Sequence, residues 1–303
     1  MKRGFYLIPV LVGVAVMTEG VKIEKDLKYD RHTLEDAYTY KTTERAFQWE
    51  KIAGKIDSLI TFENAAKEFA ALSNYKNRNG VAPLADSASR DAYRAIQDKY
   101  GVKRDQSIPL YCPGNLEIPE RYERDGALVS VIKDTADYLM VESPLFSGQW
   151  LVPAKYAERL GGVDFRKLIF VDRTNQNIAT LEQGDSTWLV RSMNPATTGV
   201  QRPPFKRETP LGIYVIRTKL RSMAYLRDGG KGLGGHAPWA SRFTGGAYIH
   251  GVPTAYPKTV QYEFSWSLGT VPSSHMCVRN ATSHAQFVYD WAPVGEALVI
   301  VFD

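Results

Sequence analysis

Near residue 107 the sequence changes from a helical pattern to a pattern of short strands. Residues 31–73 are rich in Ala, Glu, Lys and Leu, and their apolar residues recur at three-to-four spacing between Phe47 and Ile60. This period predicts a helix with one buried face. After residue 107, segments such as GALVSVIKDTADYLMVES and LGIYVIR alternate apolar and polar residues between glycines and prolines, which predicts strands. We therefore expect a mixed α+β fold in which a helical region precedes a β-rich part.

The length of 303 residues favours more than one domain. We predict a signal or anchor segment, a helical region, a small β module and a larger β-rich domain, at 1–20, 21–105, 106–163 and 164–303. Within the helical region, a turn-rich linker and a shorter helix over 89–100 follow the long helix. The end of the β module, SGQWLVPAKYAERL, resembles a bacterial SH3-type module. An irregular β subdomain packed on its neighbour is the alternative.

The first twenty residues have the pattern of an export signal. Lys2 and Arg3 precede thirteen uncharged residues from Phe5 to Met17, a stretch that is short for a membrane span. No clear small-x-small cleavage site follows, so retention as an anchor is one alternative and an apolar first element of the fold is another. We expect export to the cell envelope or periplasm, with membrane contact only through an uncleaved N-terminal anchor.

The charge pattern argues against a nucleic-acid partner. The 38 basic and 33 acidic residues give a net charge of +5, and no block of five like charges occurs. A basic patch of the kind that neutralises phosphates is therefore missing from the sequence.

Two cysteines, Cys112 and Cys277, occur in the chain. An even number in an exported protein favours a disulfide. However, Cys277 lies in SSHMCVRN, between a histidine and an arginine. It could be a buried apolar residue, half of a disulfide, a metal ligand or a nucleophile. The residues around it must distinguish these roles.

Two of the competing chemistries fit the sequence poorly. GGKGLGG at 229–235 has the glycine spacing of a dinucleotide motif, but Pro238 prevents the helix that the motif needs, so we predict a mobile loop. The five histidines and two cysteines match no zinc spacing, so we expect no metal. We expect no other cofactor either.

Nucleophilic catalysis fits better. A thiolate attacks carbonyl groups when a neighbouring base takes its proton. Two histidines compete for that role: His275, two residues before Cys277, and His250, at the end of the strand-like GGAYIHG.

A family resemblance separates these candidates. IHG followed by SSHMCVRN resembles the signature of the L,D-transpeptidase catalytic domain (YkuD) family. Four further segments occur in the family's order: LIFVDRTNQNIATLEQGDSTWLVR, TPLGIYVI, HAPWASRFTGGAYIHG and VGEALVIV. The resemblance covers about residues 166–302 and implies a β-rich catalytic domain.

The resemblance also implies roles for individual residues. Cys277 would be the nucleophile, His250 the base, and the carbonyl of Gly251 would orient the imidazole. Ser274, His275 and Met276 would shape the pocket and oxyanion site, and Arg279 would hold loop or substrate carboxylates. Further candidates for the cleft are His236, Trp239 and Tyr248. Because a catalytic thiol must stay free, we predict that Cys112 and Cys277 are not bonded.

The chain departs from the family pattern at two places. Met276 stands where the family has glycine, and methionine carries strain of about 1–3 kcal/mol if that position needs a positive φ. Between His250 and Ser274 lie 23 residues, more than the family usually has, so this segment must bulge.

The function implied is an exported cysteine acyltransferase that acts on peptidoglycan stem peptides in cell-wall biosynthesis and cell shape. It would release D-alanine from a tetrapeptide through a thioester, and carbapenems would acylate Cys277. Two alternatives remain open: a non-catalytic peptidoglycan-binding envelope protein, and an L,D-carboxypeptidase that uses water as the acceptor. The sequence does not select the acyl acceptor.

Overall fold

The computed structural model describes residues 16–17, 20–83, 96–97, 103–104 and 108–303. Most of the predicted signal segment and of the helix expected over 89–100 lies outside them. The two described residues of that helix, Ile96–Gln97, form strand β6, which pairs with β7 (Lys103–Arg104). No helix in the described ranges is both long and apolar enough to cross a membrane.

A seven-stranded sheet forms the centre of the β-rich domain. Two pairs of neighbours run parallel, β14 with β23 and β2 with β16, and the other neighbours are antiparallel. In spatial order the strands are β1 (Val16–Met17), β2 (Lys22–Lys25), β16 (Trp188–Pro195), β15 (Asn177–Gln183), β14 (Lys167–Asp172), β23 (Ala297–Phe302) and β17 (Gly212–Val215).

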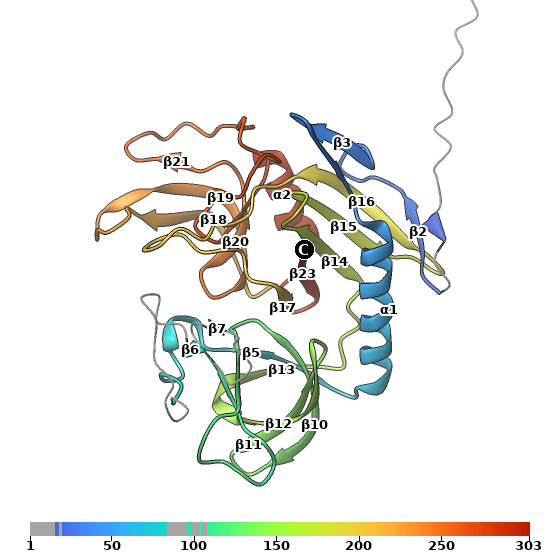
Figure 1. Cartoon of the computed structure of the whole chain (residues 1–303), viewed down its shortest axis with the longest axis vertical. Coiled ribbons are helices and arrows are strands. Elements are labelled where there is room, and N and C mark those ends of the chain that lie inside the picture. The colour runs from blue at the N-terminus through green and yellow to red at the C-terminus, as the bar shows by residue number, and fades with distance from the viewer. Residues whose placement is uncertain (1–15, 18–19, 84–95, 98–102, 105–107) are drawn as a thin grey trace, which may run out of the picture.

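One helix packs on each face of this sheet. Along β14, alternate residues point to opposite faces. Leu168 belongs to the core cluster that contains α1 (Trp49–Ala65), whereas Ile169 belongs to the cluster that contains α2 (Thr282–Trp291). Figure 1 shows α1 running along the sheet beside β14 and β16. The sheet is therefore buried on both sides, which explains its near-continuous apolar strands.

A second sheet places the residues around Cys277. Its order is β18 (Thr218–Leu226), β19 (Leu233–Thr244), β20 (Ala247–His250) and β22 (Val278–Arg279), with β21 (Thr254–Ala255) paired to β19. The β18–β19 hairpin carries GGKGLGG at its tip, so the predicted loop is a hairpin turn without a following helix.

A third sheet forms the smaller lobe in Figure 1. It contains β12 (Phe146–Pro153), β11 (Tyr138–Ser143), β10 (Leu128–Thr135), β5 (Phe69–Leu72) and β13 (Ala157–Gly161). The hairpin of β8 (Ile108–Leu110) and β9 (Arg121–Glu123) lies beside it. Its likeness to an SH3 module, and the division of the chain into domains, stay predictions.

The helix expected over 31–73 is shorter than predicted, and α1 occupies only its centre. The preceding AYTYKTTERA is rich in Tyr and Thr and forms the hairpin β3 (Ala37–Tyr40) and β4 (Thr43–Ala46), with Lys41 in the turn at φ 56°. At the other end, β5 is fully buried between β10 and β13. Pairing within a sheet overrides the helix propensity of FAAL there.

The small lobe and the β-rich domain share one hydrophobic core. A single cluster includes Val129 and Val152 of the small lobe together with Ile169 and Val299 of the central sheet. At the contact, the N–H of Val215 donates to Gly126 O at 2.9 Å. The mostly β architecture with few helices agrees with the predicted L,D-transpeptidase-like fold class.

Candidate active site

The strands β20 and β22 bring the two central candidates together. They run parallel, with Ile249 opposite Val278 and His250 opposite Arg279. Cys277 directly precedes β22, so it lies level with Tyr248, two residues before His250 on β20. The 26 residues between His250 and Cys277 therefore return the chain to the strand beside β20.

His250 is buried and oriented by the backbone. His250 is only 3% exposed, and its Nδ1 is 2.6 Å from the carbonyl oxygen of Gly251. Burial lowers the pKa of His250 to about 4; the contact with Gly251 opposes this shift, and the charge of Arg279 adds to it. The imidazole is therefore neutral at pH 7, with Nδ1–H donating to Gly251 and Nε2 left as the basic nitrogen.

Cys277 carries a free, half-buried thiol, and Cys112 is also free, as predicted. The sulfur of Cys277 lies 3.6 Å from the carbonyl oxygen of Gly246. Burial raises the pKa of the Cys277 thiol, while the backbone N–H of Tyr248 and the charge of Arg279 lower it. In the resting site the thiol is thus protonated and the imidazole neutral.

Arg279 adds a positive charge that no described side chain neutralises. Its Nε is buried and has no hydrogen-bond partner within the described part of the chain. Burial lowers the pKa of this guanidinium, and interactions with Cys277 and Tyr225 oppose that shift. A half-buried cation beside a thiol, with its Nε unpaired, suits an anion that forms during reaction.

The loop before the nucleophile has a strained backbone. Met276 adopts φ 142°, the region that favours glycine. The backbone N–H of Met276 donates to Ser274 Oγ at 3.3 Å, and the hydroxyl of Ser274 donates to the carbonyl of Cys277. Met276, which stands where the family has glycine, therefore does adopt a positive φ. Because the Met276 N–H is engaged, the N–H of Cys277 is the better candidate to hold an oxyanion.

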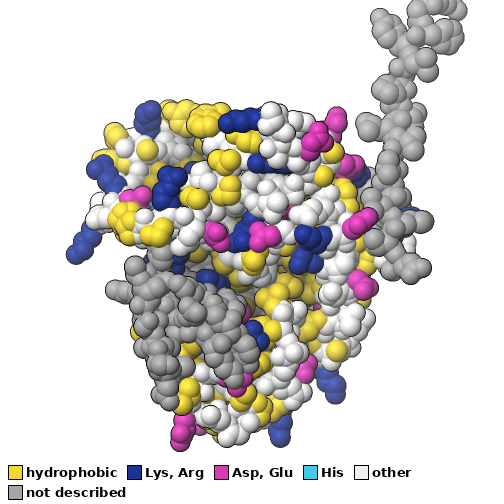
Figure 2. All heavy atoms as spheres, viewed as in Figure 1, with side chains coloured by type: hydrophobic (Ala, Val, Ile, Leu, Met, Phe, Trp, Pro, Cys, Tyr) yellow, Lys and Arg dark blue, Asp and Glu magenta, His cyan; other side chains and the backbone are white. Residues whose placement is uncertain are grey.

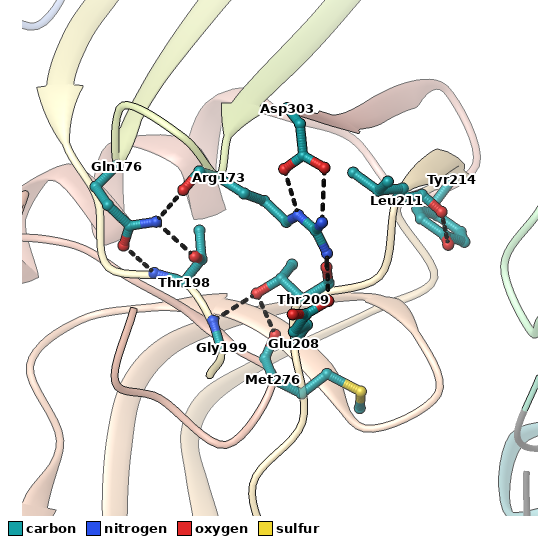
Figure 3. A network of polar contacts seen from close by, with 10 residues as sticks. All are labelled: Arg173, Gln176, Thr198, Gly199, Glu208, Thr209, Leu211, Tyr214, Met276 and Asp303. Carbon is teal, nitrogen blue, oxygen red and sulfur yellow. Dashed lines mark hydrogen bonds and ion pairs between the residues drawn. The ribbon is translucent and has the colours of Figure 1, made fainter. Parts of the chain in front are cut away.

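Residues from another part of the chain hold this loop (Figure 3). The hydroxyl of Thr209 donates to the carbonyl of Met276 and accepts from the N–H of Gly199, both at 2.8 Å. A Cβ on Gly199 would lie 2.7 Å from the Cα of Met276, so only glycine allows this approach. Thr209 belongs to the segment TPLGIYVI, but nothing in that pattern predicts this contact.

Arg173 supports the same network (Figure 3). Its guanidinium donates to the carbonyl of Thr209 at 2.8 Å and to both carboxylate oxygens of Asp303 at 2.8 and 2.7 Å. Nothing in the local sequence signals this role, because the three residues lie far apart in the chain.

Several predicted cleft residues have other surroundings. Trp239 packs its ring on Tyr289 of α2, with centroids 5.4 Å apart. His236 is exposed, with its ring 3.5 Å from Ser222 Oγ. His275 bonds to Asp228 at the tip of the β18–β19 hairpin, with Nε2 2.8 Å from Oδ1. The structure thus links the loop before Cys277 to that hairpin tip.

Tyr248 is buried beside the nucleophile. Its hydroxyl lies 3.4 Å from the hydroxyl of Tyr75, which comes from the segment after β5. The guanidinium of Arg242 lies over the ring of Tyr75, 4.3 Å from its centroid. Tyr75 was not among the predicted site residues, and it reaches Tyr248 from outside the β-rich domain. Within the described ranges, no cluster of three metal-ligating side chains occurs.

Comparison with known proteins supports the predicted resemblance. Residues 166–301 match the model of the YkuD family, described as the L,D-transpeptidase catalytic domain. The chain matches no curated protein.

Solved structures similar to this chain include three at low identity. An L,D-transpeptidase from Mycobacterium smegmatis is 20% identical, over 56% of this chain and 80% of that chain, with a TM-score of 0.37. L,D-transpeptidase 3 from Mycobacterium tuberculosis, in complex with a faropenem-derived adduct, is 17% identical over 61% and 72%, with a TM-score of 0.36. A fused Zn-dependent amidase/peptidase/peptidoglycan-binding domain-containing protein from Clostridium acetobutylicum is 15% identical over 45% and 52%, with a TM-score of 0.32. The chain therefore spans about half of the length of the last protein.

Proposed function

We propose, because residues 166–301 match the model of the L,D-transpeptidase catalytic domain (YkuD) family, that the protein is an exported cysteine acyltransferase of peptidoglycan stem peptides. The donor is a tetrapeptide whose last residue, D-alanine, leaves. The observation that carries the proposal is the arrangement of His250 on β20 and of Arg279 on the adjacent parallel strand β22, which Cys277 directly precedes.

In the first step the Cys277 thiol gives its proton to Nε2 of His250, and the sulfur attacks the carbonyl carbon of the donor's last peptide bond. The carbonyl oxygen becomes an oxyanion, which the N–H of Cys277 and the charge of Arg279 stabilise. The Nδ1–H bond to Gly251 keeps the ring in the tautomer that accepts the proton, because it fixes the other nitrogen as the donor.

In the second step the oxyanion collapses and the carbon–nitrogen bond breaks. The imidazolium of His250 protonates the departing amine of D-alanine, so a thioester on Cys277 remains. An acceptor amine then attacks the thioester carbon and gives a proton to His250. The carbon–sulfur bond breaks, and the thiolate takes the proton back.

The low pKa of His250 favours the second half of this sequence. The imidazole is neutral before attack, and the imidazolium gives its proton up readily to the leaving amine, but it is a weak base towards a thiol whose own pKa is raised, so the proton moves as the sulfur attacks. The raised pKa of Cys277 keeps the thiol protonated until substrate arrives. A protonated thiol is also less exposed to oxidation in the cell envelope.

Carbapenems offer the same chemistry in a strained ring. Attack of Cys277 on the lactam carbonyl would open the ring and leave the drug bound as a thioester, with its own nitrogen as the tethered leaving group. The experiment that tests the proposal is therefore the detection of a covalent acyl group on Cys277, with Cys277→Ala as the control.

A further inference from the structure

The turn between β19 and β20 borders the sulfur of Cys277. Gly245 and Gly246 form this turn, which we call the glycine turn. The sulfur lies 3.6 Å from the carbonyl oxygen of Gly246, and the backbone N–H of Tyr248 interacts with the same sulfur. A Cβ added to Gly246 would lie 3.4 Å from Cε of Met276, so the turn also contacts the residue before the nucleophile. The position of the glycine turn therefore shapes the surroundings of the thiol.

A buried carboxylate of the small lobe holds the glycine turn. Asp125, in the turn before β10, is only 1% exposed. One of its carboxylate oxygens accepts the N–H of Gly245 at 3.2 Å and a bond from the guanidinium of Arg242. The other oxygen accepts the N–H of Asn74 at 2.9 Å. A single side chain thus connects the turn beside the thiol with two segments that precede the β-rich domain.

The backbones of the two parts touch directly at this point. Gly126 has a φ of 85°, and a Cβ there would lie 1.9 Å from the carbonyl oxygen of Phe243, two residues before the glycine turn. Only glycine permits this approach. Figure 2 shows hydrophobic side chains along the junction of the small lobe with the β-rich domain. The glycine turn is therefore packed against the small lobe as well as bonded to it.

Tyr75 makes a second contact, with Tyr248. The two hydroxyl oxygens are 3.4 Å apart, and the guanidinium of Arg242 lies 4.3 Å from the centre of the Tyr75 ring. Tyr248 is buried, and among the residues that the structure describes Tyr75 is the one hydrogen-bond partner of its hydroxyl. A buried hydroxyl that loses its partner is destabilised. Tyr75 therefore favours the observed position of Tyr248, whose backbone N–H interacts with the sulfur.

The segment that presents Tyr75 has a strained backbone. Lys76 and Asn77 adopt φ values of 55° and 56°, in the left-handed region. The preceding Asn74 is fully buried, and its side-chain amide donates to the carbonyl oxygen of Gly80 at 3.1 Å. Strain of this kind persists only where the surrounding contacts hold the conformation, and it is concentrated near functional sites. The fold thus fixes Tyr75 in place beside Tyr248.

Both Asp125 and Tyr75 lie before residue 166, where the match to the catalytic-domain family begins. We propose that these two residues are positioning residues for the nucleophile: they hold the glycine turn and Tyr248 against Cys277, so that the small lobe sets the reactivity of the thiol. This inference rests on the proposed function, because it takes Cys277 as the group that attacks. A displacement of about 1 Å near reacting atoms can lower a rate by about a hundredfold.

The first test separates the rate of attack from the binding of the donor. Tyr75→Phe removes one hydroxyl, and Asp125→Asn keeps the shape of the side chain and removes its charge. We expect each to lower roughly tenfold both kcat on the tetrapeptide and the rate constant for acylation by a carbapenem. The concentrations that give half-maximal rate should change by less than about twofold, because the lost interaction acts on the attacking group.

Tyr122→Phe is the matched control. It removes a tyrosine hydroxyl elsewhere in the small lobe, where that hydroxyl donates to the carbonyl oxygen of Pro83 at 2.8 Å. This variant should keep the wild-type rates. A double variant, Tyr75→Phe/Tyr248→Phe, should lose no more than Tyr248→Phe alone, because Tyr75 acts through Tyr248.

Alkylation of Cys277 by iodoacetamide provides a measurement that a purely structural role would not change. In a Cys112→Ser background, Tyr75→Phe should need a higher pH than the wild type for the same rate. The reason is that a displaced Tyr248 no longer directs its N–H at the sulfur, and only the thiolate reacts. Tyr122→Phe should retain the wild-type curve.

Three results would overturn the proposal: wild-type acylation and alkylation in Tyr75→Phe, equal changes in Tyr122→Phe, or additive losses in the double variant. If Asp125→Asn does not fold, the Tyr75 variants decide. If neither donor acylates the wild type, the proposed function fails, but the alkylation curve still tests the positioning. A shift caused by Tyr75→Phe alone would then support it, and an unchanged curve would refute it.

Discussion

Met276 places a side chain where the backbone has a positive φ, and the rest of the loop holds it there. The carbonyl of Met276 is fixed by Thr209 and its N–H by Ser274, so the peptide has little freedom to relax. A positive φ in a residue other than glycine costs about 1–3 kcal/mol. Its side chain recovers part of this cost by packing against the core.

This conflict predicts an inversion of the usual ranking of alanine and glycine. Met276→Ala and Met276→Gly lose the same packing, but alanine keeps the strain. We expect the glycine variant to be more stable than the alanine variant by about 1 kcal/mol, although glycine is normally the less stable of the two. Urea unfolding of both proteins measures the difference. Equal stabilities, or a more stable alanine variant, would show that the loop relaxes in solution.

The pKa directions of Cys277 and His250 predict a pH profile for the thiol. Because burial raises the pKa of Cys277 and lowers that of His250 to about 4, the two do not form a thiolate–imidazolium pair at rest. In a Cys112→Ser background, the alkylation rate of Cys277 by iodoacetamide should rise steadily up to about pH 9, since only the thiolate reacts. A plateau that begins below about pH 7 would indicate a preformed ion pair instead.

For single residues, the sequence predicted a role only where the residue lay within a short motif. Cys277 and His250 could be selected because their neighbours carry a family pattern. Arg173 and Tyr75 could not, because each acts through a contact that only the folded chain creates: Arg173 with Thr209 and Asp303, and Tyr75 with Tyr248. The role of Trp239 in the cleft stays a prediction, and its ring packs on Tyr289 of α2.

At the scale of elements, the nucleophile loop depends on the segment before β17. Thr209 is fully buried, and its hydroxyl joins Gly199 to Met276. Thr209→Val should lower the free energy of unfolding by about 1–3 kcal/mol, because a buried N–H loses its acceptor. A displaced loop should also reduce turnover by roughly tenfold or more.

Thr209→Ser is the matched control, because it keeps the hydroxyl and removes only a methyl group. It should retain most of the turnover. If Thr209→Val loses stability but keeps the wild-type rate on the tetrapeptide donor, the network supports the fold without positioning Cys277.

The helix expected over 31–73 shows why the bounds of helices and strands were hard to predict from the sequence. The apolar residues at helical spacing form a helix only in α1, where Ile52 and Ile56 pack on the central sheet. On either side of α1, pairing between strands determines the secondary structure. β3 pairs with β4 through a turn, and β5 pairs with strands more than fifty residues away in the chain. A local pattern contains no information about such distant partners.

At the scale of the whole molecule, the small lobe is joined to the β-rich domain by a buried ion pair. Arg242 of β19 contacts Asp125 in the turn before β10, and both side chains are less than 10% exposed. Asp125 also accepts bonds from the N–H groups of Asn74 and Gly245, at 2.9 and 3.2 Å. The pair thus connects three segments around Tyr75.

Removing one partner should leave the other charge buried and alone. We expect Asp125→Asn and Arg242→Met each to lower the free energy of unfolding by about 3–5 kcal/mol, and the double variant to lose less than the sum. Urea unfolding of the full chain checks this. Strictly additive losses would mean that the two residues do not act as a pair.

The proposed function requires that Cys277 is an activated nucleophile, and the intact mass of the full chain after incubation with a carbapenem, beside Cys277→Ala, tests this. We predict a mass gain of one drug molecule on the wild type and none on the variant. An unmodified wild type, in which iodoacetamide still labels Cys277, would contradict the claim, because the thiol would then be accessible without the machinery to attack a carbonyl group.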